Sequence, residues 1–166
     1  LATREQPYFD WGYICPTHDE YRSGLLEIIE DSAAVNDAVR LDDVGFPREG
    51  YCRCDRCQQQ FNHSTAETWQ SWRDDVITEF VETATALIPG RTYFTLYPDP
   101  YPGHLSERSG INIERIAEYV DEFVIPLYDI HYGTTYWLET IVKGFQSRID
   151  TIERDIDVSV ELYAVD

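Results

Sequence analysis

The strongest constraint on the fold of this chain is its alternation of short β-branched or aromatic runs with amphipathic helical stretches. Strands that alternate with helices in this way form parallel βα units. This order fits either a closed eight-stranded barrel or an open doubly wound sheet. We predict helices over residues 20–33, 64–88, from about 112 and over 134–154, and strands over 38–46, 92–97, 122–128 and 158–165.

The barrel is the better of these two architectures for this sequence. No glycine-rich turn of the kind that binds phosphate follows a predicted strand, so a nucleotide-binding open sheet loses its main support. We therefore expect an α/β fold of the parallel (β/α) barrel type. A closed barrel takes about 250 residues. These 166 residues, which begin with Leu and contain no Met, supply four or five βα units of a partial TIM barrel.

The domain organisation follows from the same count. Residues 1–166 are expected to form a single (β/α) domain that is a fragment of a longer barrel. A missing chain segment or a second copy in a homo-oligomer would complete it. The long helix is expected to open with a capping box that runs from Ser64 to Glu67.

Side-chain alternation separates two faces of the predicted strands. Arg40 and Asp42 alternate with apolar residues in the first strand, and Glu161 and Tyr163 do so in the last. The apolar faces should pack on the helices, which leaves the polar faces pointing into a barrel lumen. A purely structural parallel strand is apolar on both faces. Polar side chains at these positions are costly, so we interpret them as functional.

Carboxylates gather at the predicted strand ends, where barrels place their chemistry. Hydrolysis of a glycosidic bond needs two carboxyl groups, one protonated and one ionised. The alternation selects Asp42 and Glu161 as this pair. Acidic and aromatic residues near the strand ends are candidates for binding a carbohydrate, because tyrosine rings can stack on sugar faces. These candidates are Tyr97, Tyr128, Asp43 and Asp129.

Four cysteines point to a metal site. Cys52, Cys54 and Cys57 form a C-x-C-x-x-C cluster in a loop insertion predicted over residues 45–63, and Cys15 stands alone upstream. A disulfide framework would spread its cysteines to close long loops, whereas dense spacing favours one tetrahedral zinc. Cys15 can complete a four-sulfur site, and His18 or His63 are alternatives for the fourth ligand. Four protein ligands leave no open position, so the zinc would be structural.

The charge of the chain excludes some partners. Thirty-one acidic residues face 13 basic ones, giving a net charge of −18. This field repels nucleic acid and anionic membrane surfaces. No apolar run reaches the roughly 20 residues that span a membrane. We interpret the acidic surface as adaptation to high salt, with an acidic partner-binding surface as the alternative, and the metal-binding thiols as a sign of a reducing, cytoplasmic compartment.

Three stretches of the sequence resemble a group of barrel glycoside hydrolases and hydrolase-like proteins, which includes the zinc-containing β-galactosidases. They are residues 14–22 (ICPTHDEYR), 39–43 (VRLDD) and 50–57 (GYCRCDRC). In those β-galactosidases one upstream cysteine joins a C-x-C-x-x-C cluster that follows the fourth strand. The resemblance therefore implies that all four cysteines are zinc ligands.

The resemblance also implies catalytic roles. If the strand before the cysteine loop is the fourth, Glu161 lies on the seventh, where these enzymes carry their nucleophile. Our own assignment, from the strand alternation, adds Asp42 as general acid/base and Arg40 and Tyr163 as residues that position the carboxyls and adjust their pKa values, with Asp166 in reserve for Glu161. The β-galactosidases have an Asn-Glu pair where this chain reads Asp42-Asp43. This difference keeps open a catalytically silent sugar-binding or structural barrel.

Overall fold

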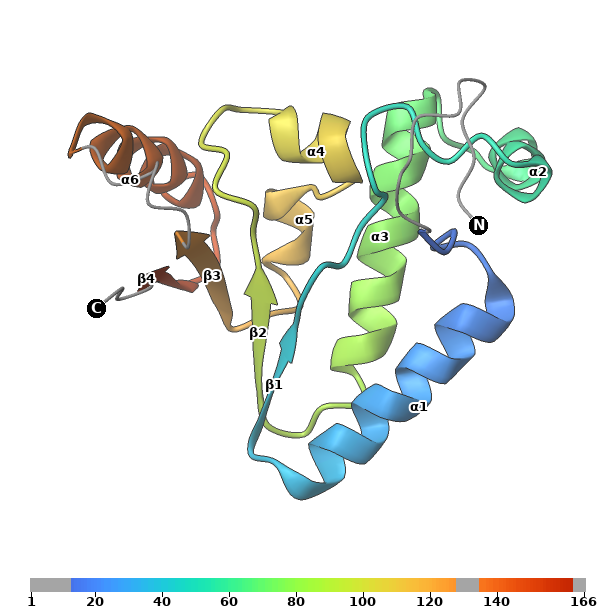
Figure 1. Cartoon of the computed structure of the whole chain (residues 1–166), viewed down its shortest axis with the longest axis horizontal. Coiled ribbons are helices and arrows are strands. Elements are labelled where there is room, and N and C mark those ends of the chain that lie inside the picture. The colour runs from blue at the N-terminus through green and yellow to red at the C-terminus, as the bar shows by residue number, and fades with distance from the viewer. Residues whose placement is uncertain (1–12, 128–134, 163–166) are drawn as a thin grey trace.

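A computed structural model describes residues 13–127 and 135–162 of the chain. Within them, four strands form one sheet in the order β1-β2-β3-β4, and every neighbouring pair is parallel (Figure 1). A sheet in which spatial order follows chain order is what successive βα units produce. The strands are β1 (Ala38–Leu41), β2 (Arg91–Thr95), β3 (Glu122–Leu127) and β4 (Asp157–Leu162).

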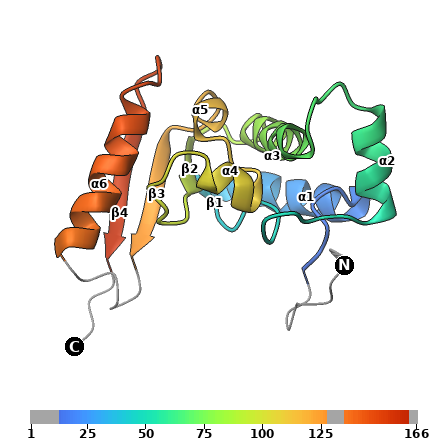
Figure 2. The ribbon, with the colours of Figure 1, turned by 90° about the horizontal axis from the view of Figure 1, so that it is seen from above.

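Helices connect the strands and flank the sheet. Figure 1 shows α1 and α3 side by side next to β1 and β2, and Figure 2 shows α6 alongside β4. Helix α6 comes so close to the loop between β2 and α4 that a Cβ at Gly144 would lie 2.4 Å from the Cβ of Pro100. The helices are α1 (Asp19–Val35), α2 (Asp55–His63), α3 (Trp69–Thr85), α4 (His104–Ser109), α5 (Ile113–Ile116) and α6 (Thr135–Ile149).

The register of the sheet confirms the two faces expected from the sequence. Leu41 pairs with Phe94, and Phe94 pairs with Phe123. All three are buried on the outer face, under the helices, where the two phenylalanine rings meet edge to face with centroids 6.3 Å apart. One residue earlier in each strand, Arg40 pairs with Tyr93 on the opposite, inner face.

The sheet is an open arc. Within the described residues, β1 and β4 each pair with one strand only. The outer face of β4 is also exposed. The accessible fractions of its residues Val158, Val160 and Leu162 are 38%, 43% and 69%. The expectation of a partial barrel of four or five βα units is therefore met by four strands and their helices.

Three details of the predicted helices and loops are wrong. Helix α3 begins at Trp69, and its capping box is formed by Thr68 and Ser71, because the Thr68 hydroxyl accepts from the Ser71 backbone N–H. Ser64 instead ends helix α2, which lies inside the segment predicted as a loop. The segment 98–110, between the predicted strand and the predicted helix from about residue 112, has no predicted helix but contains helix α4. Among the described residues, no helix is long and apolar enough to cross a membrane.

Candidate functional site

The inner face of the sheet brings together residues from three strands. Arg40 on β1 donates from Nη1 to Glu161 Oε2 on β4, at 2.8 Å, and from Nε to Thr95 Oγ1 on β2, also at 2.8 Å. Arg40 and Glu161 are 121 positions apart in the chain, so this contact depends on the curvature of the sheet. A guanidinium beside a carboxylate favours the ionised form of that carboxylate.

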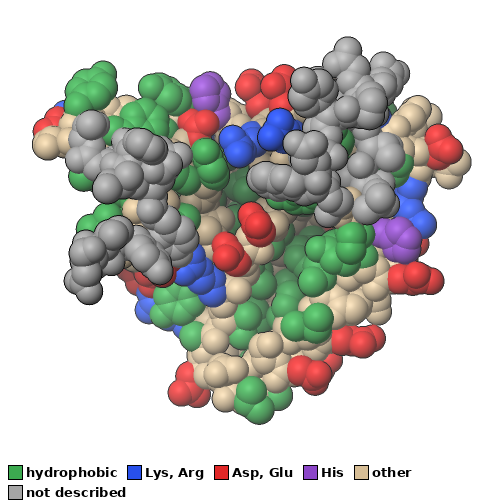
Figure 3. Space-filling model, in the orientation of Figure 1, with side chains coloured by type: hydrophobic (Ala, Val, Ile, Leu, Met, Phe, Trp, Pro, Cys, Tyr) green, Lys and Arg blue, Asp and Glu red, His purple; other side chains and the backbone are tan. Residues whose placement is uncertain are grey.

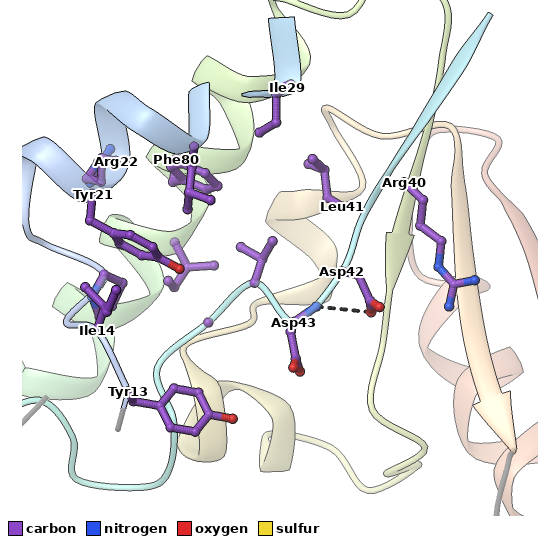
Figure 4. A pocket seen from close by; sticks show the side chains of 15 residues that line it. Tyr13, Ile14, Tyr21, Arg22, Ile29, Arg40, Leu41, Asp42, Asp43 and Phe80 are labelled. Atoms are coloured by element: carbon purple, nitrogen blue, oxygen red, sulfur yellow. Dashed lines mark hydrogen bonds between the residues drawn. The ribbon is translucent and has the colours of Figure 1, made fainter. Parts of the chain in front are cut away.

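Asp42 and Asp43 lie directly beyond the end of β1. The backbone N–H of Asp43 donates to Asp42 Oδ1 at 3.1 Å, and Asp43 has a φ of 54°. Positive φ is uncommon for a residue other than glycine and clusters at functional sites, although aspartate tolerates it better than most residues. Both carboxylates are exposed, and Figure 4 shows them near the strand end, with Arg40 farther back along the same strand.

Two hollows meet at these carboxylates. The first, which we call the inner hollow, has a volume of about 300 Å³ and includes Thr95, Tyr97 and Arg108 as well as Asp42 and Asp43. The second, the edge hollow, has a volume of about 530 Å³ and lies between α1 and the edge of β1 that has no partner strand among the described residues. Its apolar lining includes Leu41, Ile29 and Phe80, which Figure 4 shows facing one another.

The predicted sugar-binding residues fall into two groups. Tyr97 follows β2 at the mouth of the inner hollow with 42% of its surface exposed, and Asp43 shares that hollow. Tyr163, Tyr128 and Asp129, like the reserve carboxylate Asp166, lie outside the described residues.

Sequence reasoning missed two residues of this region, Arg108 and Tyr13. Arg108 is in helix α4, which the sequence did not predict, and Tyr13 precedes α1 and lines both hollows. The alternation of Tyr93, Thr95 and Tyr97 marks the inner face of β2, but no periodic signal indicates a neighbour that comes from a loop.

The four cysteines converge on one point. All are free, and their sulfur atoms lie within 4.8 Å of one another. The Sγ–Sγ distances are 3.8 Å for Cys15–Cys54, 3.3 Å for Cys15–Cys57 and 3.5 Å for Cys54–Cys57. A tetrahedral zinc with bonds of about 2.3 Å would hold its sulfurs roughly 3.8 Å apart. These thiols therefore fit a metal ion, and they are too far apart for a disulfide bond of about 2.05 Å.

The cluster joins two loops that are distant in the sequence. Cys15 precedes α1, whereas Cys52 and Cys54 follow β1 and Cys57 is in α2. An ion pair of 2.6 Å between Arg56 and Asp19 adds a second link between the same two segments. The cluster contains Cys15 and neither of the two alternative ligands that the sequence suggested, His18 and His63.

Packing of the thiols disfavours their ionisation in the absence of a cation. The hydrogen bond with Cys52 is the largest cause that raises the pKa of Cys15, to about 11. The pKa of Cys57 is raised still further, first by its hydrogen bond with Cys15. Thr17 acts against both shifts, since its hydroxyl lies 3.1 Å from Cys15 Sγ and 3.4 Å from Cys57 Sγ. A bound metal would replace these protons.

A buried arginine fixes the loops above the inner face. The guanidinium of Arg73 in α3 is fully buried and donates to the backbone carbonyls of Arg48, Glu107 and Arg108 at 3.0, 2.7 and 2.9 Å. Burial lowers its pKa to about 10, so it remains charged at neutral pH. Through this one side chain, the loop after β1 and helix α4 are held together.

Comparison with known proteins identifies the fold. No protein family model and no curated protein sequence matches this chain. Solved structures do match it, among them the glycoside hydrolase domain of PgaB (BpsB) from Bordetella bronchiseptica, with a TM-score of 0.70 and 15% sequence identity. The alignment covers 98% of this chain and 54% of the other, so this chain spans about half the length of that neighbour.

The likeness establishes a glycoside hydrolase-like fold of the partial TIM-barrel type. At this level of sequence identity it establishes the fold alone, because one barrel fold supports many chemistries. Any statement about substrate or reaction must come from the residues at the strand ends.

Proposed function

We propose that this chain carries the carboxylate face of a carbohydrate-active hydrolase, with Asp42 as general acid/base and Glu161 as nucleophile. The observation that carries this proposal is the contact between Arg40 and Glu161 on the inner face, one residue from the strand end where Asp42 and Asp43 border the inner hollow. Barrel enzymes bind substrate at this end of their strands. The neighbour that is a glycoside hydrolase domain supports a carbohydrate as the substrate class.

The proposed chemistry assigns one task to each carboxyl group. Asp42 gives its proton to the glycosidic oxygen, while Glu161, held ionised by Arg40, attacks the anomeric carbon. Asp42 then takes a proton from the water that releases the sugar from Glu161. Tyr163 would assist Arg40 in positioning, and Tyr97, Tyr128, Asp43 and Asp129 would contact the sugar.

An assay with aryl glycosides and oligosaccharides in molar KCl tests this assignment. We expect Glu161→Gln to abolish turnover of any substrate that the protein accepts and to leave the fold intact by circular dichroism. Glu153→Gln, which changes an exposed glutamate outside the inner face, is the matched control and should retain full activity. Turnover that survives Glu161→Gln would contradict the assignment, and sugar binding without turnover by the unmodified protein would identify the silent barrel instead.

We also propose that the metal is zinc and that its role is structural. Four thiol ligands leave no position for a substrate, and thiolates favour zinc over harder cations such as magnesium. When bound, the ion would supply charge that keeps all four sulfurs deprotonated. A relation to the zinc-containing β-galactosidases and a reducing, cytoplasmic location are in keeping with this proposal.

Completion of the barrel is part of the same proposal. The unpaired edges of β1 and β4 among the described residues, and the exposed valines on the outer face of β4, suit further parallel βα units. These units would come from another segment of polypeptide or from a second copy of the chain. Mass measurement by light scattering, across protein concentrations, distinguishes a dimer from a monomer.

A further inference from the structure

Arg108 differs from most of the arginines that the structure describes. Seven of those arginines form an ion pair with a carboxylate: Arg22, Arg40, Arg56, Arg91, Arg115, Arg148 and Arg154. The guanidinium of Arg108 instead stacks on the ring of Tyr97, with its central carbon 3.9 Å from the ring centroid. Among the described residues, no carboxylate forms an ion pair with it, although the chain carries 31 acidic residues.

This stacked pair is held in place before any ligand arrives. Buried Arg73 binds the carbonyl of Arg108 at 2.9 Å, and the backbone N–H of Phe46 donates to the carbonyl of Ser109 at 2.9 Å. The Tyr97 ring beneath limits the freedom of the Arg108 side chain as well. A binding group that is ordered in advance loses less entropy when it captures a ligand.

The pair lies at the mouth of the inner hollow. Arg108 and Tyr97 line it together with Asp42 and Asp43. Figure 3 shows the same polarity on the surface, where basic side chains gather over α4 above a depression with acidic and hydrophobic side chains. A sugar with a negative substituent would be repelled by the aspartates and attracted to Arg108, so the hollow would orient it.

We infer that Arg108 and Tyr97 form a subsite for a carboxylate-bearing sugar, a hexuronate, at the entrance to the proposed catalytic hollow. Stacking occupies one face of the guanidinium and leaves its N–H donors, which lie in the plane of the group, available. A planar guanidinium matches a planar carboxylate through two parallel hydrogen bonds. This inference rests on the proposed function, and it narrows the substrate from carbohydrates in general to acidic ones.

Binding of matched acidic and neutral ligands tests the subsite. The probes are oligosaccharides of galacturonate and glucuronate, the methyl esters of the same oligosaccharides and a sulfated oligosaccharide, each titrated calorimetrically into the protein at one fixed KCl concentration. We expect at least one acid form to bind about tenfold or more tightly than its own ester, a difference typical of a charge-assisted hydrogen bond. The sulfated probe should bind less tightly than that acid, because its tetrahedral group fits the planar fork less well.

Variants of Arg108 test whether its side chain causes the preference for the acid over the ester. Arg108→Gln should remove the preference for acid over ester, and Arg108→Lys should retain only part of it because the fork is lost. Arg115→Gln removes an exposed arginine that is paired with Asp75, so it is a matched control for net charge and should leave the preference unchanged.

Three results would overturn the inference. They are equal binding of acid and ester, a preference that survives Arg108→Gln, and tighter binding of the sulfated probe than of every hexuronate. In these cases oligosaccharide binding itself remains, and the proposed function stands. If no oligosaccharide binds in any form, acidic or neutral, both the subsite and the proposed function fail.

Discussion

The cysteine cluster and the inner face of the sheet are both assembled from distant parts of the chain. They differ in how complete each site is within the described residues. The four sulfurs surround one point, and the described residues supply every ligand that a structural zinc needs. The inner face is contributed by an open arc of four strands with two unpaired edges among the described residues. The described residues complete the cysteine cluster, whereas the sheet has no partner strand beyond β1 or beyond β4 among those residues.

Because of this difference, we expect the cysteine cluster to contribute to stability and the inner face to contribute to function. A closed metal site converts binding free energy into folding free energy. The carboxylates and Arg108 are instead exposed at a hollow, where their charges add little to stability and can meet a ligand. We therefore expect substitutions at the cysteines to act on folding and substitutions on the inner face to act on binding and turnover.

The largest effect is expected from Cys57→Ser. Cys57 is fully buried, and its loss should lower the free energy of unfolding by more than about 5 kcal/mol, because structural zinc sites contribute on the order of 10 kcal/mol. Denaturant unfolding with and without a chelator measures this. Chelation should destabilise the unmodified protein to a similar degree and should have little effect on the variant. Gln59→Ala, at an exposed position of the same helix, is the control, and equal stability of both variants would contradict a metal role.

The next largest effect is expected from Arg73→Met. Methionine fills much of the same volume but leaves three backbone carbonyls without their donor, so the free energy of unfolding should fall by on the order of 4 kcal/mol. Arg115→Met, which removes only an exposed ion pair, should cost less than about 1 kcal/mol. The metal content by mass spectrometry should stay the same in both variants. Loss of metal from Arg73→Met would show that the two regions are one cooperative unit.

A smaller effect is expected from salt. A net charge of −18 on 166 residues causes self-repulsion that screening relieves. The melting temperature should rise by about 10 °C between dilute buffer and molar KCl, roughly 3 kcal/mol for a chain of this size. NaCl should act like KCl because screening does not depend on the cation. A flat profile would count against salt adaptation and in favour of a specific cationic partner.

The smallest effect on stability is expected at the inner face. Arg40 and Glu161 retain 31% and 42% of their side-chain surface, so their coupling in a double-mutant cycle should stay below about 1 kcal/mol. The cycle uses Arg40→Gln, Glu161→Gln and the pair, measured by denaturant unfolding. A coupling of about 3 kcal/mol or more would make this a structural ion pair and remove the distinction between the two regions.

The sequence was a good guide where a periodic pattern carries the information. The alternation of Val39, Arg40 and Leu41 predicted the two faces of β1, and the spacing of the cysteines predicted their convergence. The alternation and the C-x-C-x-x-C spacing depend on local geometry, which neighbouring residues determine, whereas Cys15 comes from a loop about 40 positions upstream. The same reasoning placed Arg40 and Glu161 on one face from different strands, and their ion pair agrees with that placement.

The sequence was a poor guide where several local signals compete or where tertiary contacts decide. Ser64 and Thr68 both resemble helix N-caps, and α3 begins at the second because α2 extends to His63. Helix α4 has only six residues and carries no visible hydrophobic period, so Arg108 could not be placed. The burial of Arg73 has no signal in the sequence, because its partners are backbone carbonyls that no sequence pattern marks.

Arg73 has a consequence for how this end of the molecule comes apart. Its bond to the carbonyl of Arg48 lies only four positions before Cys52, so the loop after β1 is anchored twice within a short stretch by groups of different chemistry. Oxidation of the cysteines or loss of the metal would release the attachment at Cys52. Neither change would affect the hydrogen bond from the Arg73 guanidinium to Arg48. Local opening should therefore begin at the cysteines and stop at Arg48. Hydrogen exchange in metal-depleted protein should quicken in α2 while α4, and with it the mouth of the inner hollow, keeps its protection.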